Sequence, residues 1–521
     1  MPDIMTRYRN TLFLSALVLF AFAIRFRFAG QYAESWDAVD FALALQRFDI
    51  FHMQPHFPGY PLYILTAHLF ANGTTDPVQA LTCLSVCFGS LSVIPFYSLA
   101  KRLLPDQQAV WIAVLLFVTS PLLGLAHVQP MSEALGLFAV LLYVSLLACS
   151  LNSKKPLVEL SMGAILFAIV LGIRISYFPV GLLLLYPLAR LYRQRSGLGP
   201  FLLQTVGAGC LFLLALAAWL LPTAATEGGL VPYWQLGKAF TAGHFTEWGG
   251  TSFSSEAAWW ERLQTLVWDR LLVNGLIGAS SLSDGIPLPV WLSASLLAAF
   301  LVLGWAGATD AFRRGEASVR WFLLLAVVPY ALWVFFGQNS EKARHLLPLL
   351  PWLYLLLGRG WAYVRSKWRG PAGALVLHSL TVLLLVSLLV RQWTVLQQHL
   401  FPPPALQLVT YVQQHFPAEG TIIYTWEEQR LFDYYAPEYD TERLRSFDYF
   451  AQSLQLRAPS VSRVLVTNAV LDGFGPGVHL PANELARFNA DPFLYPSYHT
   501  VVLYELSPQT IERIASGMLR P

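Results

Sequence analysis

Long apolar segments constrain this chain more than any other feature of its sequence. Hydrophobic residues make up 55% of the 521 residues and charged residues only 12%, against about 25% charged in a typical soluble protein. A helix needs roughly 20 mostly apolar residues to cross the hydrocarbon core of a bilayer. Eleven segments approach this length: 11–28, 78–100, 109–127, 132–151, 157–173, 177–191, 201–222, 289–308, 320–337, 346–364 and 372–392. The sequence therefore predicts a mainly α fold, a polytopic transmembrane helical bundle.

Basic residues in the short loops indicate how the bundle is oriented. Cytoplasmic loops are enriched in Lys and Arg, and with the N-terminus inside, every second loop is short and basic. The unusual polar residues lie in the alternate loops, which include the long segments 31–77 and 223–288. We therefore expect an active site outside the cytoplasm. No small-residue cleavage site follows the first apolar segment, which predicts a retained signal-anchor helix.

A run of prolines in "QQHLFPPPALQ" separates the last apolar segment from a soluble C-terminal region, because proline neither continues a helix nor pairs inside a sheet. Beyond it, β-branched runs alternate with amphipathic segments. Strands are predicted at 420–426, 462–468 and 499–506, and helices at 404–416, 440–454 and 507–519. We predict two domains: a transmembrane catalytic domain over 1–395, and a small extracytoplasmic α/β domain over 404–521.

Three carboxylates, Glu34, Asp37 and Asp40, follow the first apolar segment in "ESWDAVDFA". Asp37 and Asp40 are three residues apart, so in a helix they would share a face. A carboxylate there could act as a general base toward an acceptor hydroxyl or bind a cation, and the alternative is a solvated acidic loop. The rigid turn "PHFPGYP", with His56 and Tyr60, lies in the same loop and favours a site. The apolar stretch 61–71 is too short to span and predicts an interfacial or re-entrant helix.

Two further ionisable residues lie at the ends of apolar segments on the same predicted side. Glu133 opens one segment in "HVQPMSEALGLF", and Arg174 follows another in "LGIRISYFP". Ionisable groups at membrane depth are costly and often functional. Glu133 could instead interact favourably with a helix N-terminus, and Arg174 could extend its charge to the interface. As substrate-binding residues, Glu133 would orient the acceptor or the base, and Arg174 would bind donor phosphate or pair with a first-loop carboxylate.

The late stretch "GQNSEKARHLLPLLPW" places Lys342, Arg344 and His345 at the outer mouth of a predicted span, against the positive-inside trend. Basic side chains at this position suit a phosphate leaving group, because its negative charge grows as the bond to the sugar breaks. Arg contributes planar, multidentate hydrogen bonding and Lys a point charge. The alternative is that these side chains simply extend to the membrane surface.

No cofactor is expected from the sequence, and a bound divalent metal ion is the alternative. Asp37, Asp40, His52 and His56 are residue types that bind zinc, but Pro55 prevents helical spacing of the two histidines and no H-E-x-x-H sequence occurs. The net charge of +3 comes from dispersed residues, so nucleic acid is not an expected partner.

The acidic first loop, the "HFPGYPLY" turn and the late "ARHLLPLLP" stretch together resemble the polytopic GT-C glycosyltransferases, within about residues 10–395. The likeness is greatest to the branch of protein O-mannosyltransferases and aminoarabinose transferases. It implies a polyprenyl-phosphate-linked sugar as donor, an Asp of the first external loop as catalytic base, and a bacterial inner (plasma) membrane location.

Asp37 takes the place of the leading Asp in the family pattern D-E-x-x-Y-x-x-A, which makes it the first choice for the base. The chain departs from the family at Ala38, where Glu is common, and at Phe57, where Pro is common. Asp40 could supply the second carboxylate, so the choice between the two stays open.

The resulting expectation is an inverting membrane glycosyltransferase whose acceptor hydroxyl belongs to a lipid, a glycan or a protein, with membrane lipid as a further partner. A lipid-linked saccharide transporter or flippase is the first alternative. Such proteins place ionisable residues near the bilayer midplane, often with repeat symmetry, and this sequence shows neither feature. A non-catalytic partner in envelope glycan assembly is the other alternative.

Overall fold

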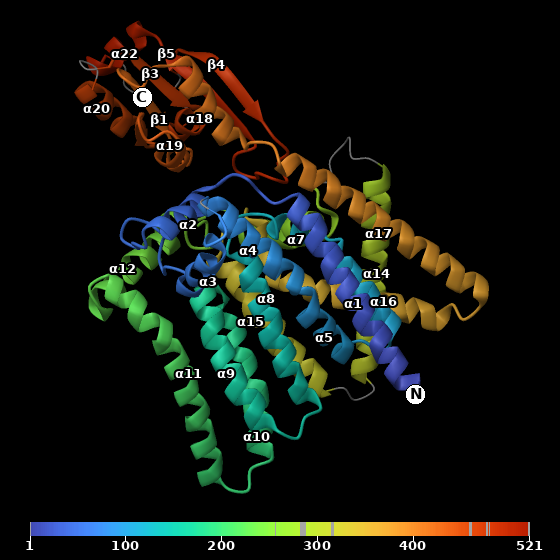
Figure 1. Cartoon of the computed structure of the whole chain (residues 1–521). Coiled ribbons are helices and arrows are strands. Elements are labelled where there is room, and N and C mark those ends of the chain that lie inside the picture. The colour runs from blue at the N-terminus through green and yellow to red at the C-terminus, as the bar shows by residue number, and fades with distance from the viewer. Residues whose placement is uncertain are drawn as a thin grey trace. The chain divides into compact units, whose positions relative to one another are not determined.

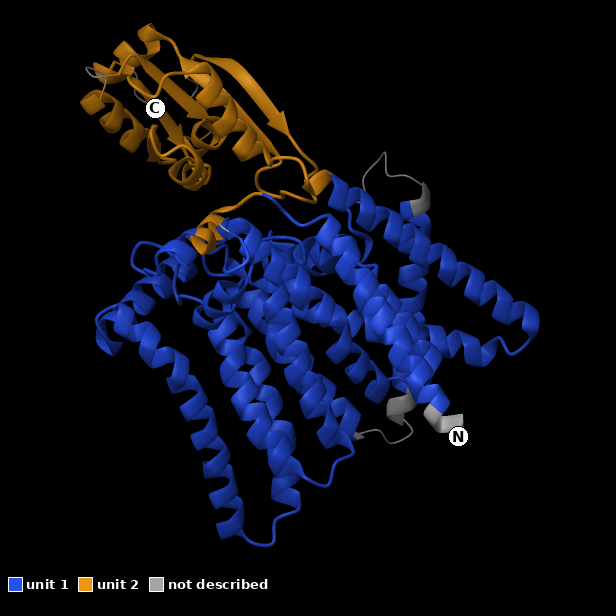
Figure 2. Cartoon of the chain, viewed as in Figure 1, with its two compact units in different colours: residues 1–31, 43–397 blue, residues 32–42, 398–521 orange. Residues whose placement is uncertain are grey.

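A computed structural model describes residues 2–74, 76–255, 257–281, 288–313, 317–457, 461–475, 478 and 480–518. The chain forms two compact units (Figure 2). Unit 1 comprises residues 1–31 and 43–397, and unit 2 comprises residues 32–42 and 398–521. A short piece of the first predicted external loop therefore groups with the C-terminal region, which the sequence had not suggested.

Unit 1 is a bundle of helices (Figure 1). Its α-helices are α1 (Pro2–Arg27), α3 (Pro61–Ala71), α4 (Pro77–Leu91), α5 (Val93–Leu103), α6 (Gln107–Val118), α7 (Pro121–Ala126), α8 (Glu133–Ala148), α9 (Pro156–Ile173), α10 (Leu185–Arg193), α11 (Leu198–Thr226), α12 (Leu230–Gly243), α13 (Trp259–Gln264), α14 (Leu288–Arg313), α15 (Ala317–Gly337), α16 (Leu350–Lys367) and α17 (Pro371–His399), whose last residues belong to unit 2. Irregular helical turns connect several of them: η1 (Cys149–Leu151), η2 (Ile175–Leu184), η3 (His244–Trp248), η4 (Thr265–Ile277) and η5 (Ala343–Leu349).

In the part of the chain that the structure describes, nine helices are long and apolar enough to cross a membrane. The prediction of a polytopic, mainly α membrane protein is confirmed. Helix α3 occupies the short apolar stretch that was predicted as a non-spanning helix, although no membrane position follows from its length alone.

Two of the eleven predicted spans are not among these nine helices. The segment 109–127 is interrupted, because α6 ends at Val118 and α7 begins at Pro121, which has no backbone N–H to continue the helix. The hydroxyl of Ser120 instead accepts a hydrogen bond from the Leu123 backbone N–H at 3.3 Å. The segment 346–364 starts in the 3-10 turn η5, which contains Pro348, and ends in the basic last turn of α16.

Unit 2 contains a five-stranded sheet with the strand order β2-β1-β3-β5-β4. Strands β2 (Asp440–Arg443), β1 (Thr421–Thr425) and β3 (Arg463–Thr467) are parallel, whereas β5 (Thr500–Leu506) runs antiparallel to β3 and to β4 (Ala482–Asn489). The helices of the unit are α18 (Pro404–His415), α19 (Gln429–Tyr435), α20 (Phe447–Arg457), α21 (Asn468–Gly473) and α22 (Pro508–Ala515), and the first turns of α2 (Trp36–Gln46) also belong to it. Tyr424, Phe450 and Val464 are fully buried in its core. The predicted small α/β domain is confirmed as a fold.

The prediction of a helix over 440–454 is wrong for its first half. Residues Asp440–Arg443 form the edge strand β2, in which Thr441 pairs with Ile423 of β1, and the helix begins only at Phe447. The charged and polar residues of this strand suit an exposed sheet edge. Strand β4 was not predicted.

Candidate active site

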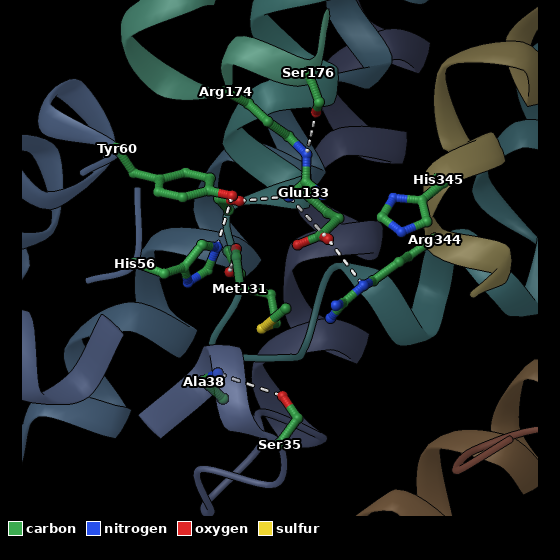
Figure 3. A network of polar contacts seen from close by, with 12 residues as sticks. Ser35, Ala38, His56, Tyr60, Met131, Glu133, Arg174, Ser176, Arg344 and His345 are labelled. Atoms are coloured by element: carbon green, nitrogen blue, oxygen red, sulfur yellow. Dashed lines mark hydrogen bonds and ion pairs between the residues drawn. The ribbon is translucent and has the colours of Figure 1, made fainter. Parts of the chain in front are cut away.

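Two arginines lie beside one buried glutamate in unit 1. Arg174 Nη1 is 3.0 Å from Glu133 Oε1, and Arg344 Nε is 3.7 Å from the same oxygen. The Glu133 side chain is 2% exposed, that of Arg174 8%, and that of Arg344 23%. Figure 3 shows the two guanidinium groups approaching the carboxylate from different elements. We name Glu133, Arg174 and Arg344 the ion cluster.

The local backbone explains where these side chains begin. Glu133 is the first residue of α8, directly after Ser132. Arg174 is the residue at which α9 ends, and its extended conformation separates that helix from the 3-10 turn η2. The Arg174 guanidinium also donates to Ser132 Oγ at 2.7 Å and to Ser176 Oγ at 3.2 Å. Hydrogen bonds from several directions therefore hold Arg174 in one orientation.

The Pro-rich turn places His56 and Tyr60 near the ion cluster. Tyr60 precedes α3 in the left-handed conformation, with φ 46° and ψ 45°, and His56 Nε2 lies 3.0 Å from its hydroxyl. Gly59 has φ +93°, and a Cβ there would lie 2.6 Å from Ile50 Cδ1, so glycine is required by both conformation and space. In Figure 3 the Tyr60 hydroxyl points toward Glu133 and Arg174.

The late basic residues lie around η5. Arg344 and His345 are both half-buried within this turn, and the backbone carbonyl of His345 accepts a hydrogen bond from the Tyr330 hydroxyl at 2.8 Å. Lys342 directly precedes the turn, is half-buried, and forms no ion pair with an acid among the described residues. Of the predicted basic residues here, the structure joins Arg344 to Glu133 and leaves Lys342 outside the ion cluster.

The two first-loop carboxylates belong to unit 2 and have different surroundings. Asp37, in the first turn of α2, is half-buried. Asp40, one turn later, is fully buried, and its Oδ1 accepts a hydrogen bond of 2.8 Å from Arg430 Nε. A general base must reach the proton that it removes. The partial exposure of Asp37 fits this requirement better than the full burial of Asp40.

No group of three or more His, Cys, Asp or Glu residues in the described part of the chain is placed to hold a metal ion. His52, which was weighed as a ligand, instead has its Nδ1 2.8 Å from Asp49 Oδ2 on the surface.

Two solved structures of ArnT from Cupriavidus metallidurans are similar to this chain. The apo form matches over 97% of this chain and 99% of that one, with 11% identity and a TM-score of 0.50. The form bound to undecaprenyl phosphate matches over 96% and 98%, with 11% identity and a TM-score of 0.52. The chain has the GT-C fold. No protein-family model and no curated protein matches its sequence.

The GT-C fold extends over nearly the whole chain, further than the residues 10–395 on which the sequence resemblance depended. Sequence reasoning missed two serines beside the ion cluster and, within unit 2, the arginine that pairs with Asp40. Ser132 and Ser176 lie within two residues of the predicted Glu133 and Arg174, and this closeness in sequence could have identified them. Arg430, which pairs with Asp40 across 390 positions of sequence, had no such signal.

Proposed function

We propose that the protein is an inverting membrane glycosyltransferase that moves a sugar from a polyprenyl-phosphate-linked donor to an acceptor hydroxyl outside the cytoplasm. The observation that carries the proposal is the ion cluster. Two guanidinium groups lie beside one carboxylate at a largely buried site of a GT-C fold. Clustered guanidinium groups offer charge-assisted hydrogen bonds of the kind that suit a phosphate.

A lipid-linked donor is consistent with the rest of unit 1. Nine apolar helices in the described residues supply a large bilayer-embedded surface, which a long isoprenoid chain can contact while its head group reacts at the aqueous boundary. The ArnT structure with the higher TM-score contains undecaprenyl phosphate, a carrier of this class.

The proposed reaction forms one bond and breaks one. Asp37 removes the proton of the acceptor hydroxyl, and the resulting oxygen nucleophile attacks the anomeric carbon of the sugar. The bond from this carbon to the phosphate oxygen breaks, its electron pair stays on that oxygen, and polyprenyl phosphate leaves. Attack from the face opposite the phosphate inverts the anomeric configuration.

Each arginine has a separate part in this scheme. Arg344, the more exposed of the two, contacts the leaving phosphate, whose charge increases in the transition state. Arg344 and Arg174 would repel each other, and the carboxylate of Glu133 holds them near one another. His56, Tyr60, Lys342 and His345 contribute donors that orient the sugar and the phosphate.

The test of the proposed activity is transfer by the purified protein in detergent, with synthetic polyprenyl-phosphate sugars and an extract of native membranes as the acceptor source. The expected result is release of polyprenyl phosphate that depends on the extract, measured by mass spectrometry. Cells that lack the protein should accumulate the donor, which identifies its sugar. Loss of the glycan product in those cells, with no turnover by the purified protein on any polyprenyl-linked sugar, would favour the non-catalytic alternative.

Arg344→Gln should lower kcat for transfer by about 10²–10³-fold, the usual effect of removing one donor to a developing negative charge. Arg344→Lys keeps the charge without the planar fork and should recover part of the rate. Arg369→Gln is the matched control, because Arg369 is exposed on the predicted cytoplasmic side. Equal rates in Arg344→Gln and in the control would remove Arg344 from the mechanism.

We also propose that transfer requires no metal ion, because the arginines provide the positive charge that a divalent cation would supply. Treatment with EDTA, followed by dialysis, should leave the transfer rate unchanged within about twofold. A loss of activity that Mg²⁺, Mn²⁺ or Zn²⁺ restores would contradict this part of the scheme.

A further inference from the structure

The short first-loop segment 32–42 is built into the C-terminal unit. It forms one compact unit with residues 398–521 (Figure 2), although the chain enters and leaves it through unit 1. Within this segment, Glu34, Asp37 and Asp40 follow one another at intervals of three residues. Asp37 is thus bracketed by two other acids, and each of these contacts residues far along the sequence.

The first contact is a buried ion pair on the C-terminal side of Asp37. Arg430 in α19 donates to Asp40 at 2.8 Å; the Asp40 side chain is 0% exposed and that of Arg430 11%. A buried charge that loses its partner is strongly destabilised. The pair therefore fixes the second turn of α2 against α19.

The second contact lies on the N-terminal side of Asp37. Glu34 Oε2 is 3.0 Å from His399 Nε2 and accepts a hydrogen bond of 3.1 Å from the Tyr495 hydroxyl. Glu34 and His399 are both buried. Burial, and then the charge of Glu34, raise the pKa of Tyr495 well above its ordinary value, so its hydroxyl keeps the proton that it donates to the carboxylate.

Two further contacts hold the same segment. The Arg443 guanidinium carbon is 4.7 Å from the centroid of the Trp36 ring, within the range of a cation–π interaction. The backbone N–H of Ala33 donates to the Tyr435 hydroxyl at 2.8 Å. Together with Glu34 and Asp40, these contacts leave residues 33–40 little freedom to move relative to the C-terminal sheet and its helices.

We propose that the C-terminal domain is part of the catalytic apparatus, because it holds Glu34 and Asp40 and thereby sets the position of Asp37. Asp40 and Glu34 are then positioning residues, and Asp37 is the base. This inference depends on the proposed glycosyl transfer. Its physical reason is that a displacement of about 1 Å in a reacting group can lower a rate about 10²-fold.

The test compares Arg430→Met with Arg487→Met, a matched control in which an exposed Arg pairs locally with Glu484 in the same unit. In Arg430→Met, kcat should fall about 10²-fold while KM for the donor changes less than about threefold, and Arg430→Lys should recover part of kcat. The control should keep both constants. Equal kcat values in Arg430→Met and in the control would overturn the proposal.

Hydrogen exchange supplies a measurement that does not depend on activity. In Arg430→Met, the amides of residues 33–40 should exchange faster, whereas those of strand β1 should keep their protection. Unchanged exchange at 33–40 would also overturn the proposal. If the amides of β1 lose protection, the domain has unfolded, and Tyr495→Phe replaces Arg430→Met as the test variant because it removes only one hydroxyl. Tyr495→Phe should lower kcat and speed amide exchange at residues 33–40 to a smaller degree. An unchanged kcat or unchanged exchange in Tyr495→Phe would count against the proposal.

Failure of the proposed glycosyl transfer and failure of the proposed positioning role give different results. If the wild-type protein transfers no sugar from any donor but 33–40 loosens in Arg430→Met, the anchoring stands and the proposed activity fails. If the wild type transfers sugar and Arg430→Met equals it in rate and exchange, the activity stands and the positioning role fails.

Discussion

Asp37→Asn is expected to reduce the rate of glycosyl transfer by about 10²–10⁴-fold, the usual contribution of a positioned general base. The amide keeps the shape of the carboxylate but cannot remove the proton of the substrate hydroxyl. Asp37 is half-buried, so the folded protein should tolerate the change. The measurement is the transfer rate at saturating donor, together with the midpoint of thermal unfolding in detergent, which should stay within a few degrees of the wild-type value.

Asp49→Asn is the matched control for this prediction. Asp49 lies in the same predicted external loop, where it pairs with Arg47 and with His52 on the surface, and surface pairs contribute little to stability. Its replacement should leave transfer nearly unchanged. If Asp37→Asn retains full activity while Asp40→Asn does not, the base is Asp40, and the distinction drawn from their burial is wrong.

Glu133→Gln should lower the free energy of unfolding by about 3–5 kcal/mol, the usual cost of removing one member of a buried ion pair. Without the carboxylate, Arg174 and Arg344 become neighbouring cations of which one is almost fully buried. Transfer should fall as well, because the two guanidinium groups would separate. The measurement is unfolding by SDS in mixed micelles, with secondary structure followed by circular dichroism.

Glu341→Gln serves as the control for Glu133→Gln, because Glu341 is an exposed acid only three positions from Arg344. It should change stability by less than about 0.5 kcal/mol, as most surface substitutions do. A Glu133 variant as stable as this control would mean that the ion cluster contributes specificity rather than stability.

Apolar length and proline position made most of the fold predictable. Nine of the eleven expected spans appear as long apolar helices in the described residues, because a run of about 20 apolar residues has few alternatives to spanning. The failures have local causes. Pro121 interrupts one expected span, and Asp440–Arg443 has a helical composition but forms an edge strand. Strand pairing depends on a distant partner, in this case β1, which local composition does not reveal.

The candidate site was predictable residue by residue but not as an arrangement. Glu133, Arg174 and Arg344 were each recognisable as ionisable groups at the ends of apolar segments, and the structure joins all three. The different surroundings of Asp37 and Asp40 could not be foreseen. Their spacing predicts a shared face, whereas Arg430, which donates to the buried Asp40, lies 390 positions away.

That long separation also sets an order of events during biosynthesis. At 5–20 residues per second, the ribosome reaches Arg430 about 20–80 s after Asp40, and by then most of the apolar helices have left the exit tunnel. For that interval, residues 32–42 lack the residues that anchor them in the folded protein. We expect nascent chains halted before residue 398 to be cut by protease within this segment, and chains carried past Tyr495 to be protected. An enzyme assembled in this order would stay inactive until its last domain had been translated.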